Sequence, residues 1–415
     1  MSSTGTIDVT RGAHVESRLL GRIRGGRPGP TLICIGGIHG NEPAGVYAIR
    51  RVLHALSDRA DAVSGDLVAL AGNVSALAMG RRFVDRDLNR AWTTARIEAL
   101  RALGPVPECV EDREQMELLD EIEAIVDDAR GPVFALDLHT TSGPGGVFSV
   151  FSDALPHRAF AGSFPVPMIF GLEEQVDGTL VNLLSEHGLV AITVETGQHT
   201  EPAAVDRAEA AIWVGIVAAG LLPDDLVPQV GEARRRLRRD TGHLPRALEV
   251  RYRRQMVEGD GFAMEPGYSN FQKVERGETI ARDNDGLVVA GEDARLLMPL
   301  YQEQGDDGFF LVREFRHFWM HASYILRRAG ASRHAHWLPG VRRVPDTDDE
   351  LVADKRIARL FARHLFHLLG FRQIEDAGST IVFRRRPFDE ARYLASPPVP
   401  NALEPSDVTD SGRSR

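Results

Sequence analysis

From about residue 14 to residue 220, short apolar runs alternate with longer segments of helical periodicity, and this alternation restricts the possible folds strongly. Strands and helices that alternate along a chain form a sheet with helices packed on its faces. We therefore predict an α/β domain. The expected strands are 31–35, 66–71, 132–138, 147–151 and 189–195, and the expected helices are 42–57, 111–129, 177–187 and 202–220.

The rest of the sequence has a different character. Glycine punctuates short strand-like segments between residues 245 and 312, which predicts a small β domain. The range 313–395 is rich in aromatic residues and histidine, with an amphipathic helix expected at 349–369 and a strand at 380–384. The expected organisation is a catalytic domain at 1–222, a linker at 223–244, the β domain at 245–312, an α+β extension at 313–395 and a disordered tail at 396–415.

Length and composition restrict the class of protein. A chain of 415 residues accommodates two or three domains. Its net charge of -10 argues against general nucleic-acid binding, and the run from Arg234 to Arg239 is too short to reverse that. Two cysteines provide no disulfide framework, which is typical of a cytoplasmic protein. The sequence shows no signal peptide and no apolar run of the roughly 20 residues that cross a bilayer, so we expect no membrane partner.

Two histidines and one glutamate follow predicted strands. His39 and Glu42 lie on one strand-to-helix loop, after Gly36 and Gly37. His139 follows the predicted strand 132–138. Because residues beyond the carboxyl ends of parallel strands meet in one crevice, these three side chains are expected to converge there. Two histidines and a carboxylate form an open catalytic zinc set, although the sequence alone does not distinguish zinc from another divalent ion.

Two further segments complete the candidate site. Glu195 ends an apolar strand, where a carboxylate needs a partner. A metal-bound water is a natural partner, because the carboxylate can accept its proton. The segment from Arg81 to Arg90 is rich in arginine, which suits a substrate carboxylate or a developing oxyanion. Arg81 and Arg86 are expected to be surface residues. Asp137 either orients His139 or caps a strand end, and both alternatives stay open.

Together these motifs resemble the succinylglutamate desuccinylase/aspartoacylase family, which is related to the zinc carboxypeptidases. The resemblance is carried by Gly37-Ile38-His39-Gly40-Asn41-Glu42, Arg82…Asp87-Leu88-Asn89-Arg90, Asp137-Leu138-His139 and Val194-Glu195-Thr196-Gly197, in order and spacing over about residues 14–220. It implies a three-layer α/β/α domain with a mixed central sheet. It also implies that the β domain covers the active site, on the likeness of the segments 265–271 and 297–301.

The resemblance implies a role for each residue of the site. One Zn²⁺ per chain is bound by His39, Glu42 and His139, and Glu195 is the general base and acid. Arg82 polarises the scissile carbonyl, and Asn89 and Arg90 hold a substrate carboxylate. The expected activity is cleavage of the amide bond of an N-acyl amino acid, or a similar small molecule, by attack of metal-bound water.

Two features depart from the family. The range 159–206 contains no Arg or Lys, so an acidic acyl group or side chain lacks an evident cationic partner there. The range 313–395 falls outside the resemblance, and we expect structural or surface roles for its histidines His317, His321, His334 and His336. Two other functions stay open: a zinc carboxypeptidase-like peptidase acting on small or cell-wall peptides, and a non-catalytic binding protein on the same fold. A homo-oligomer is compatible with the sequence.

Overall fold

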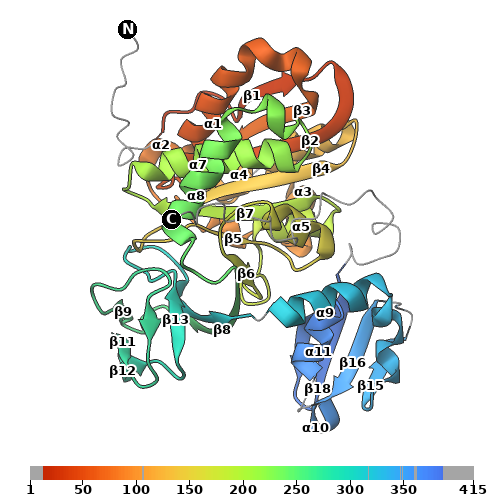
Figure 1. Ribbon diagram of the computed structural model, residues 1–415. Coiled ribbons are helices and arrows are strands. Elements are labelled where there is room, and N and C mark those ends of the chain that lie inside the picture. The colour runs from red at the N-terminus through yellow and green to blue at the C-terminus, as the bar shows by residue number, and fades with distance from the viewer. Residues whose placement is uncertain are drawn as a thin grey trace, which may run out of the picture.

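An eleven-stranded mixed sheet organises the protein (Figure 1). The computed structural model describes residues 13–104, 107–315, 317–345, 347, 349–358 and 362–386, so the expected tail at 396–415 lies outside the described residues. The strand order is β1-β3-β2-β4-β7-β5-β6-β8-β14-β13-β10. The strands are β1 (Leu19–Arg24), β2 (Arg27–Gly36), β3 (Ser64–Ala71), β4 (Val133–Thr141), β5 (Phe148–Val150), β6 (Met168–Phe170), β7 (Val190–Gln198), β8 (Ala247–Gln255), β10 (Lys273–Val274), β13 (Ala294–Leu297) and β14 (Asp307–Glu314).

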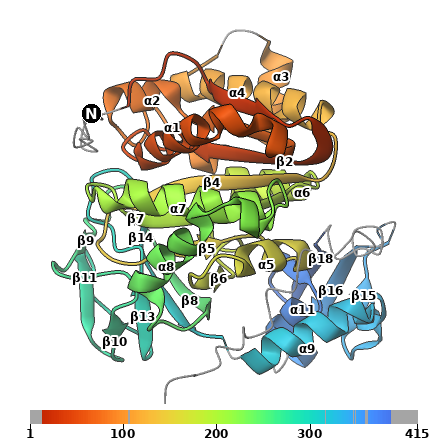
Figure 2. The same cartoon turned by 45° about the horizontal axis from the view of Figure 1, so that its top comes forward.

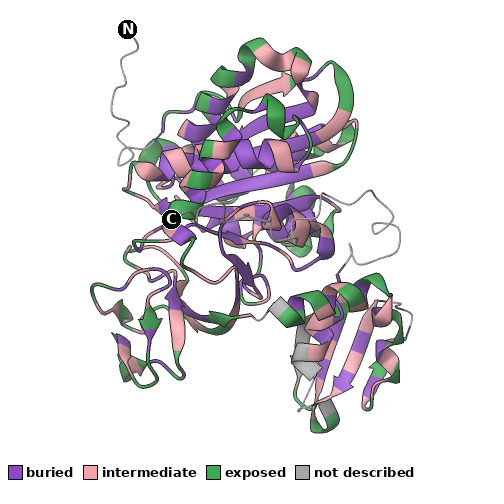
Figure 3. Cartoon of the chain, in the orientation of Figure 1, coloured by how far each residue is buried: buried purple, intermediate pink, exposed green. Residues whose placement is uncertain are grey.

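The centre of this sheet is parallel. Strand β2 pairs in parallel with β3 and β4, and β4 pairs in parallel with β7. These strands are buried along most of their length (Figure 3). Strand β5 runs antiparallel to β7, which makes the sheet mixed. The carboxyl ends of β2, β4 and β7 therefore lie at one edge, where each carries a motif predicted from the sequence.

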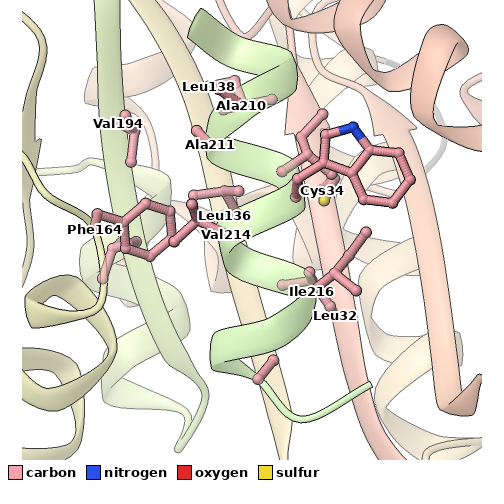
Figure 4. Close-up of a cluster of buried hydrophobic side chains, with 14 of the residues drawn as sticks. Leu32, Cys34, Leu136, Leu138, Phe164, Val194, Ala210, Ala211, Val214 and Ile216 are labelled. Carbon is pink, nitrogen blue, oxygen red and sulfur yellow. The ribbon is translucent and has the colours of Figure 1, made fainter. Parts of the chain in front are cut away.

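Helices cover both faces of the sheet. The helices of this part of the chain are α1 (Ala44–Leu56), α2 (Val74–Met79), α3 (Thr94–Leu103), α4 (Val110–Asp127), α5 (Leu155–Gly162), α6 (Leu180–Glu186), α7 (Ala203–Ala218) and α8 (Gln229–Thr241), with 3-10 turns η1 (Ser57–Ala62), η2 (Leu88–Arg90) and η3 (Asp224–Leu226). Leu32 and Cys34 of β2 face a core shared with α1, α7 and α8 (Figures 2 and 4). Ile33 and Ile35 face the opposite core, shared with α4 and α6. This two-residue alternation is the basis of the three layers.

The expected linker at 223–244 is instead largely helical. Helix α8 occupies most of it and packs against α7. Val230, Ala233 and Leu237 recur at helical spacing and are buried in the main core. The arginines of the run 234–239 take the other positions, where Arg235 and Arg239 are largely exposed. The apolar side of α8 thus packs into the main core, and the segment 223–244 belongs to the α/β layers although most of its residues are polar or charged.

The range 245–312 consists of strands, but most of them continue the main sheet. Strand β8 pairs in parallel with β6 and antiparallel with β14. Only β9 (Ala263–Met264), β11 (Thr279–Asp283) and β12 (Gly286–Val289) form a separate three-stranded sheet. The β segment is therefore joined to the α/β domain through backbone hydrogen bonds.

The C-terminal segment forms a four-stranded antiparallel sheet, ordered β15-β16-β18-β17. Its elements are α9 (His317–Arg328), η4 (Ala331–Trp337), β15 (Val341–Arg343), β16 (Glu350–Asp354), α10 (Lys355–Ala358), α11 (Ala362–Leu368), β17 (Phe371–Ala377) and β18 (Thr380–Arg385). The strand expected at 380–384 is confirmed as β18. The single helix expected at 349–369 is wrong, because Leu351 and Ala353 alternate as buried residues of β16.

Buried charges join this segment to the α/β domain. Arg327 of α9 has a fully buried side chain, and its Nη2 lies 2.9 Å from Oδ2 of Asp153, which follows β5. Nearby, Nη2 of Arg386 lies 2.9 Å from Oε1 of Glu173. A cavity of about 1600 Å³, lined in part by both acids, lies beside these contacts. Among the described residues, no helix is both long enough and apolar enough to span a membrane.

Candidate metal centre

The first motif forms the turn between β2 and α1. The backbone N–H of Glu42 donates to the carbonyl of His39 at 3.1 Å, which closes the turn just before α1 begins. Gly40 is required here, because a β-carbon would lie 2.0 Å from the carbonyl carbon of Ala76. The backbone at Gly40 thus packs closely against that of Ala76. In this turn, His39 and Glu42 lie on the same side of the loop.

The structure brings the three predicted ligands together. Nδ1 of His39 lies 2.9 Å from Oε1 of Glu42, and Nδ1 of His139 lies 3.1 Å from Oε2 of the same carboxylate. All three residues are buried, and their candidate ligand atoms lie within 4.8 Å of one another. Both histidines therefore direct Nδ1 toward one point, and the carboxylate of Glu42 lies between them.

Each histidine is oriented from behind by an aspartate. Nε2 of His39 lies 3.1 Å from Oδ1 of Asp87, and Nε2 of His139 lies 2.8 Å from Oδ2 of Asp137. A carboxylate that accepts a hydrogen bond from Nε2–H favours the tautomer in which Nδ1 keeps a lone pair for a metal ion. For Asp137, the geometry supports the first of the two alternatives, orientation of His139. The role of Asp87 was not predicted, although this residue lies within the quoted arginine motif.

The charges of the group are mutually stabilising. Burial opposes ionisation of Glu42, but His39 and His139 hold its pKa well below the usual value. Burial likewise opposes the charged form of His139, but Asp137 and Glu42 hold its pKa well above the usual value. The buried group thus balances the negative charges of Glu42 and Asp137 against the neighbouring histidines.

Glu195 lies beside the ligand group. His139 of β4 and Glu195 of β7 are register partners on adjacent parallel strands. The Glu195 side chain is buried, and its Oε2 has no hydrogen-bond partner among the described residues. Burial raises the pKa of Glu195 to about 8; His139 opposes this shift, and the carboxylates of Glu42 and Asp137 add to it. A buried acceptor without a partner is costly, so this oxygen is suited to a bound water or substrate proton.

The donor set fits zinc. Two imidazole nitrogens and one carboxylate are common zinc ligands, and three protein ligands leave a position open. The aspartates behind the histidines match the outer contacts that metal-binding histidines usually make. The partnerless oxygen of Glu195 adds an acceptor on the same side of the sheet.

The three predicted substrate-contacting residues already have protein partners. Arg82 donates from Nε and Nη2 to Oδ2 of Asp87, at 3.0 and 2.8 Å, and its Nη1 lies 3.6 Å from Oε1 of Glu42. Asn89 is buried, and its Oδ1 accepts a hydrogen bond from the backbone of Leu180. Arg90 donates to Oδ2 of Asp307 at 2.8 Å. Arg82 thus lies next to the ligand group, whereas Arg90 lies farther out.

A hydrogen-bonded set that sequence reasoning missed connects the site to the β segment. Gln302 lies in the loop 298–306 between β13 and β14, and its Oε1 accepts from Nδ2 of Asn41 at 2.9 Å. The same oxygen lies 3.1 Å from Nε2 of His199, whose Nδ1 lies 2.7 Å from Oγ1 of Thr140. His199 and Gln302 are 103 positions apart, so no local spacing could reveal this contact.

Other groups of potential ligands serve different purposes. Asp85, Cys109 and Glu111 also come together, but Glu111 accepts backbone N–H groups of the 84–86 turn and Asp85 accepts that of Val110. His334 and His336 contact the ring of Trp337. No potential metal group in the described ranges contains a histidine from the C-terminal segment, and the His317 side chain lies outside them. The cavity of about 1600 Å³ is lined by none of the predicted site residues.

The fold and the site define a mixed α/β protein with a buried His-Glu-His group at the carboxyl ends of its parallel strands. Residues 28–212 match the family described as the Succinylglutamate desuccinylase/Aspartoacylase catalytic domain. This segment, somewhat less than half of the chain, is thus similar to the catalytic domain of the succinylglutamate desuccinylase/aspartoacylase family.

Individual relatives match over short stretches. A human N-acyl-aromatic-L-amino acid amidohydrolase (carboxylate-forming) is 32% identical over 126 residues, 30% of this chain and 37% of the relative. A succinylglutamate desuccinylase of Pseudomonas putida (strain GB-1) is 35% identical over 79 residues, 18% of this chain and 24% of the relative. The chain thus covers well under half the length of these relatives.

A solved structure supports the fold. The crystal structure of a succinylglutamate desuccinylase/aspartoacylase from Rhodobacter sphaeroides superposes with a TM-score of 0.51, at 19% sequence identity. The match covers 71% of this chain and 88% of that one. At this identity the likeness establishes the mixed α/β fold.

Proposed function

We propose that this protein is a zinc-dependent hydrolase that cleaves the amide bond of an N-acyl amino acid or a similar small molecule. The observation that carries the proposal is the position of Glu195, whose partnerless Oε2 lies beside the His39–Glu42–His139 group. The names of the two relatives, both hydrolases or deacylases of N-acylated amino acids, support the same reaction.

Different residues of the site would carry out different steps of amide hydrolysis. His39, Glu42 and His139 would hold Zn²⁺, which supplies Lewis-acid activation when bound. Glu195 would accept the proton of the attacking water and deliver it to the leaving nitrogen, so that the amine departs neutral. Burial raises the pKa of Glu195 to about 8, above that of an ordinary carboxyl, which favours the return of the proton to the leaving nitrogen.

Arg82 would stabilise the negative charge that develops on the carbonyl oxygen. Its Nη1 is directed toward Glu42 at 3.6 Å, while Nε and Nη2 are fixed by Asp87. A guanidinium held on one side by a carboxylate keeps its orientation and needs little rearrangement as charge develops. The 298–306 loop would cover the site through the contacts of Gln302 with Asn41 and His199.

The proposal is tested by metal analysis and hydrolysis assays on the full chain. The purified protein should contain about one zinc per chain and release amine from N-acetyl amino acids. A Glu195→Gln variant should keep the zinc and lose activity by at least 100-fold, since general acid–base catalysis contributes roughly 10²–10⁴-fold. Full activity of Glu195→Gln would refute the assignment. A peptide that turns over faster than every N-acyl amino acid would favour the peptidase alternative.

A further inference from the structure

Side chains of increasing exposure lead outward from the ligand group. The exposed fraction rises from 2% at Glu42 to 11% at Arg82, 23% at Arg90 and 51% at Asp306. Nη1 of Arg82 lies 3.6 Å from Oε1 of Glu42, and Nε of Arg90 lies 3.6 Å from Oδ2 of Asp306. The negative charge of Asp306 also acts on Arg82. Asp306 is therefore the most exposed side chain of this series.

The loop that carries Asp306 is held against the catalytic motifs. Besides the contacts of Gln302, the loop makes two hydrogen bonds with the Ser142 hydroxyl. The hydroxyl donates to the carbonyl of Pro299 at 3.1 Å and accepts from the backbone N–H of Tyr301 at 3.1 Å. Asp307, the first residue of β14, forms ion pairs with Arg90 and Arg253. With neighbours fixed on both sides, Asp306 has a defined position relative to Arg90.

The guanidinium of Arg90 is only partly paired. Nη2 donates to Asp307 and Nη1 donates to the carbonyl of Asn89, both within 2.9 Å. Nε is buried and has no hydrogen-bond partner among the described residues. Each of Nη1 and Nη2 carries a second N–H that these two bonds do not use, so Arg90 keeps two donors for a substrate carboxylate. Asp306, in contrast, has a half-exposed carboxylate, whose ion pair with Nε of Arg90 is long, at 3.6 Å.

We propose that Arg90 and Asp306 together select an N-acyl amino acid whose side chain is positively charged. The substrate carboxylate would accept hydrogen bonds from the N–H groups of Nη1 and Nη2 that Asn89 and Asp307 leave, and the side-chain ammonium would pair with Asp306. A second carboxylate in that place would meet the like charge of Asp306 instead of a counter-ion. Like charges placed side by side disfavour the wrong partner. This inference rests on the proposed hydrolase function and narrows its substrate class.

The test compares three N-acetyl compounds of similar length: Nα-acetyl-L-ornithine, N-acetyl-L-norvaline and N-acetyl-L-glutamate. With zinc-loaded full-length protein, kcat/KM should be highest for the ornithine compound and lowest for the glutamate compound. Asp306→Asn should lower the ornithine-to-glutamate ratio at least tenfold. The matched control is Asp285→Asn, which removes the same charge from the exposed turn between β11 and β12 and should change the ratio less than twofold.

Two results would overturn the inference: a preference of the native protein for the glutamate compound, or an unchanged ratio in Asp306→Asn. Failure of the proposed function gives a different result, namely no hydrolysis of any of the three compounds. In that case, calorimetric binding to the zinc-loaded native protein decides the matter. Tighter binding of the ornithine compound, lost in Asp306→Asn, supports the selectivity, and equal or reversed binding refutes it.

Discussion

His139 and Glu195 are register partners on the adjacent parallel strands β4 and β7, so the backbone hydrogen bonds of the sheet fix the spacing between a ligand and the expected general base. Shortening the base should therefore be harmful, since the strand cannot move to compensate. We expect Glu195→Asp to lower kcat by about 10²-fold, within the range of general-base contributions. Zinc content should be unchanged. Activity within threefold of the native value in steady-state assays would show that Glu195 does not transfer the proton.

Asp137 should control zinc affinity through His139. Its Oδ2 lies 2.8 Å from Nε2 of His139, on the side of the ring opposite Glu42. Removing such an outer contact typically weakens metal binding about 10–100-fold, and we expect this for Asp137→Asn. Competition with a chromophoric chelator measures the effect. Asp120→Asn, on the exposed side of α4, serves as the control and should bind zinc like the native protein. Equal affinities of the two variants would contradict the orientation role.

Stability should fall in acid because of His157. The side chain is buried, and its Nε2 lies 3.2 Å from the carbonyl oxygen of Leu189. Burial lowers the pKa of His157 from 6.5 to about 4. The folded state thus favours the neutral imidazole of His157. Its contribution to the free energy of unfolding is complete above pH 6.5 and is lost as the pH falls toward 4. The loss amounts to about 3 kcal/mol, at 1.36 kcal/mol per pKa unit.

Denaturant unfolding between pH 7 and pH 4 checks this prediction. His157→Gln should be less sensitive to pH across this window than the native protein. His243→Gln removes an exposed histidine after α8 and should retain the full dependence. If His157→Gln follows the native curve, another group carries the acid sensitivity.

The attachment of the C-terminal segment should depend on Arg327. Its Nη2 lies 2.9 Å from Oδ2 of Asp153, and its Nη1 donates to the Asp153 carbonyl at 2.6 Å. Removing one partner of a buried ion pair costs about 3–5 kcal/mol, and we expect such a loss for Arg327→Met. Unfolding by denaturant and limited proteolysis between β14 and α9 would detect it. Arg328→Met changes the exposed neighbour on the same helix and should alter stability by less than about 0.5 kcal/mol.

Much of the α/β domain follows from local sequence. All five expected strands correspond to β2, β3, β4, β5 and β7, and the four expected helices to α1, α4, α6 and α7. Those segments have clear periodicity and end in glycine or polar residues. The sequence did not indicate β6, which has only three residues and derives its pairing from β5 and β8. Its stability comes from neighbours distant in sequence, so no local pattern could predict it.

The same distinction separates the predicted and missed parts of the site. His39, Glu42 and His139 follow strands whose ends must meet, so their convergence could be predicted. Gln302 and Asp306 come from a loop whose place depends on how β13 and β14 extend the sheet. The partners of Arg90 could not be foreseen either, because arginine pairs with whichever carboxylate the tertiary fold brings within reach.

Because β8 pairs with β6, the segment that matches the family is smaller than the segment that we expect to fold by itself. A fragment cut at residue 222 would keep residues 28–212, which match the family, but leave β6 with a row of unsatisfied backbone donors and acceptors. Bare strand edges recruit other strands, so recombinant pieces trimmed to the homology boundary are prone to self-association. Expression designs should therefore extend through β14, whose pairing with β8 protects that border of the sheet.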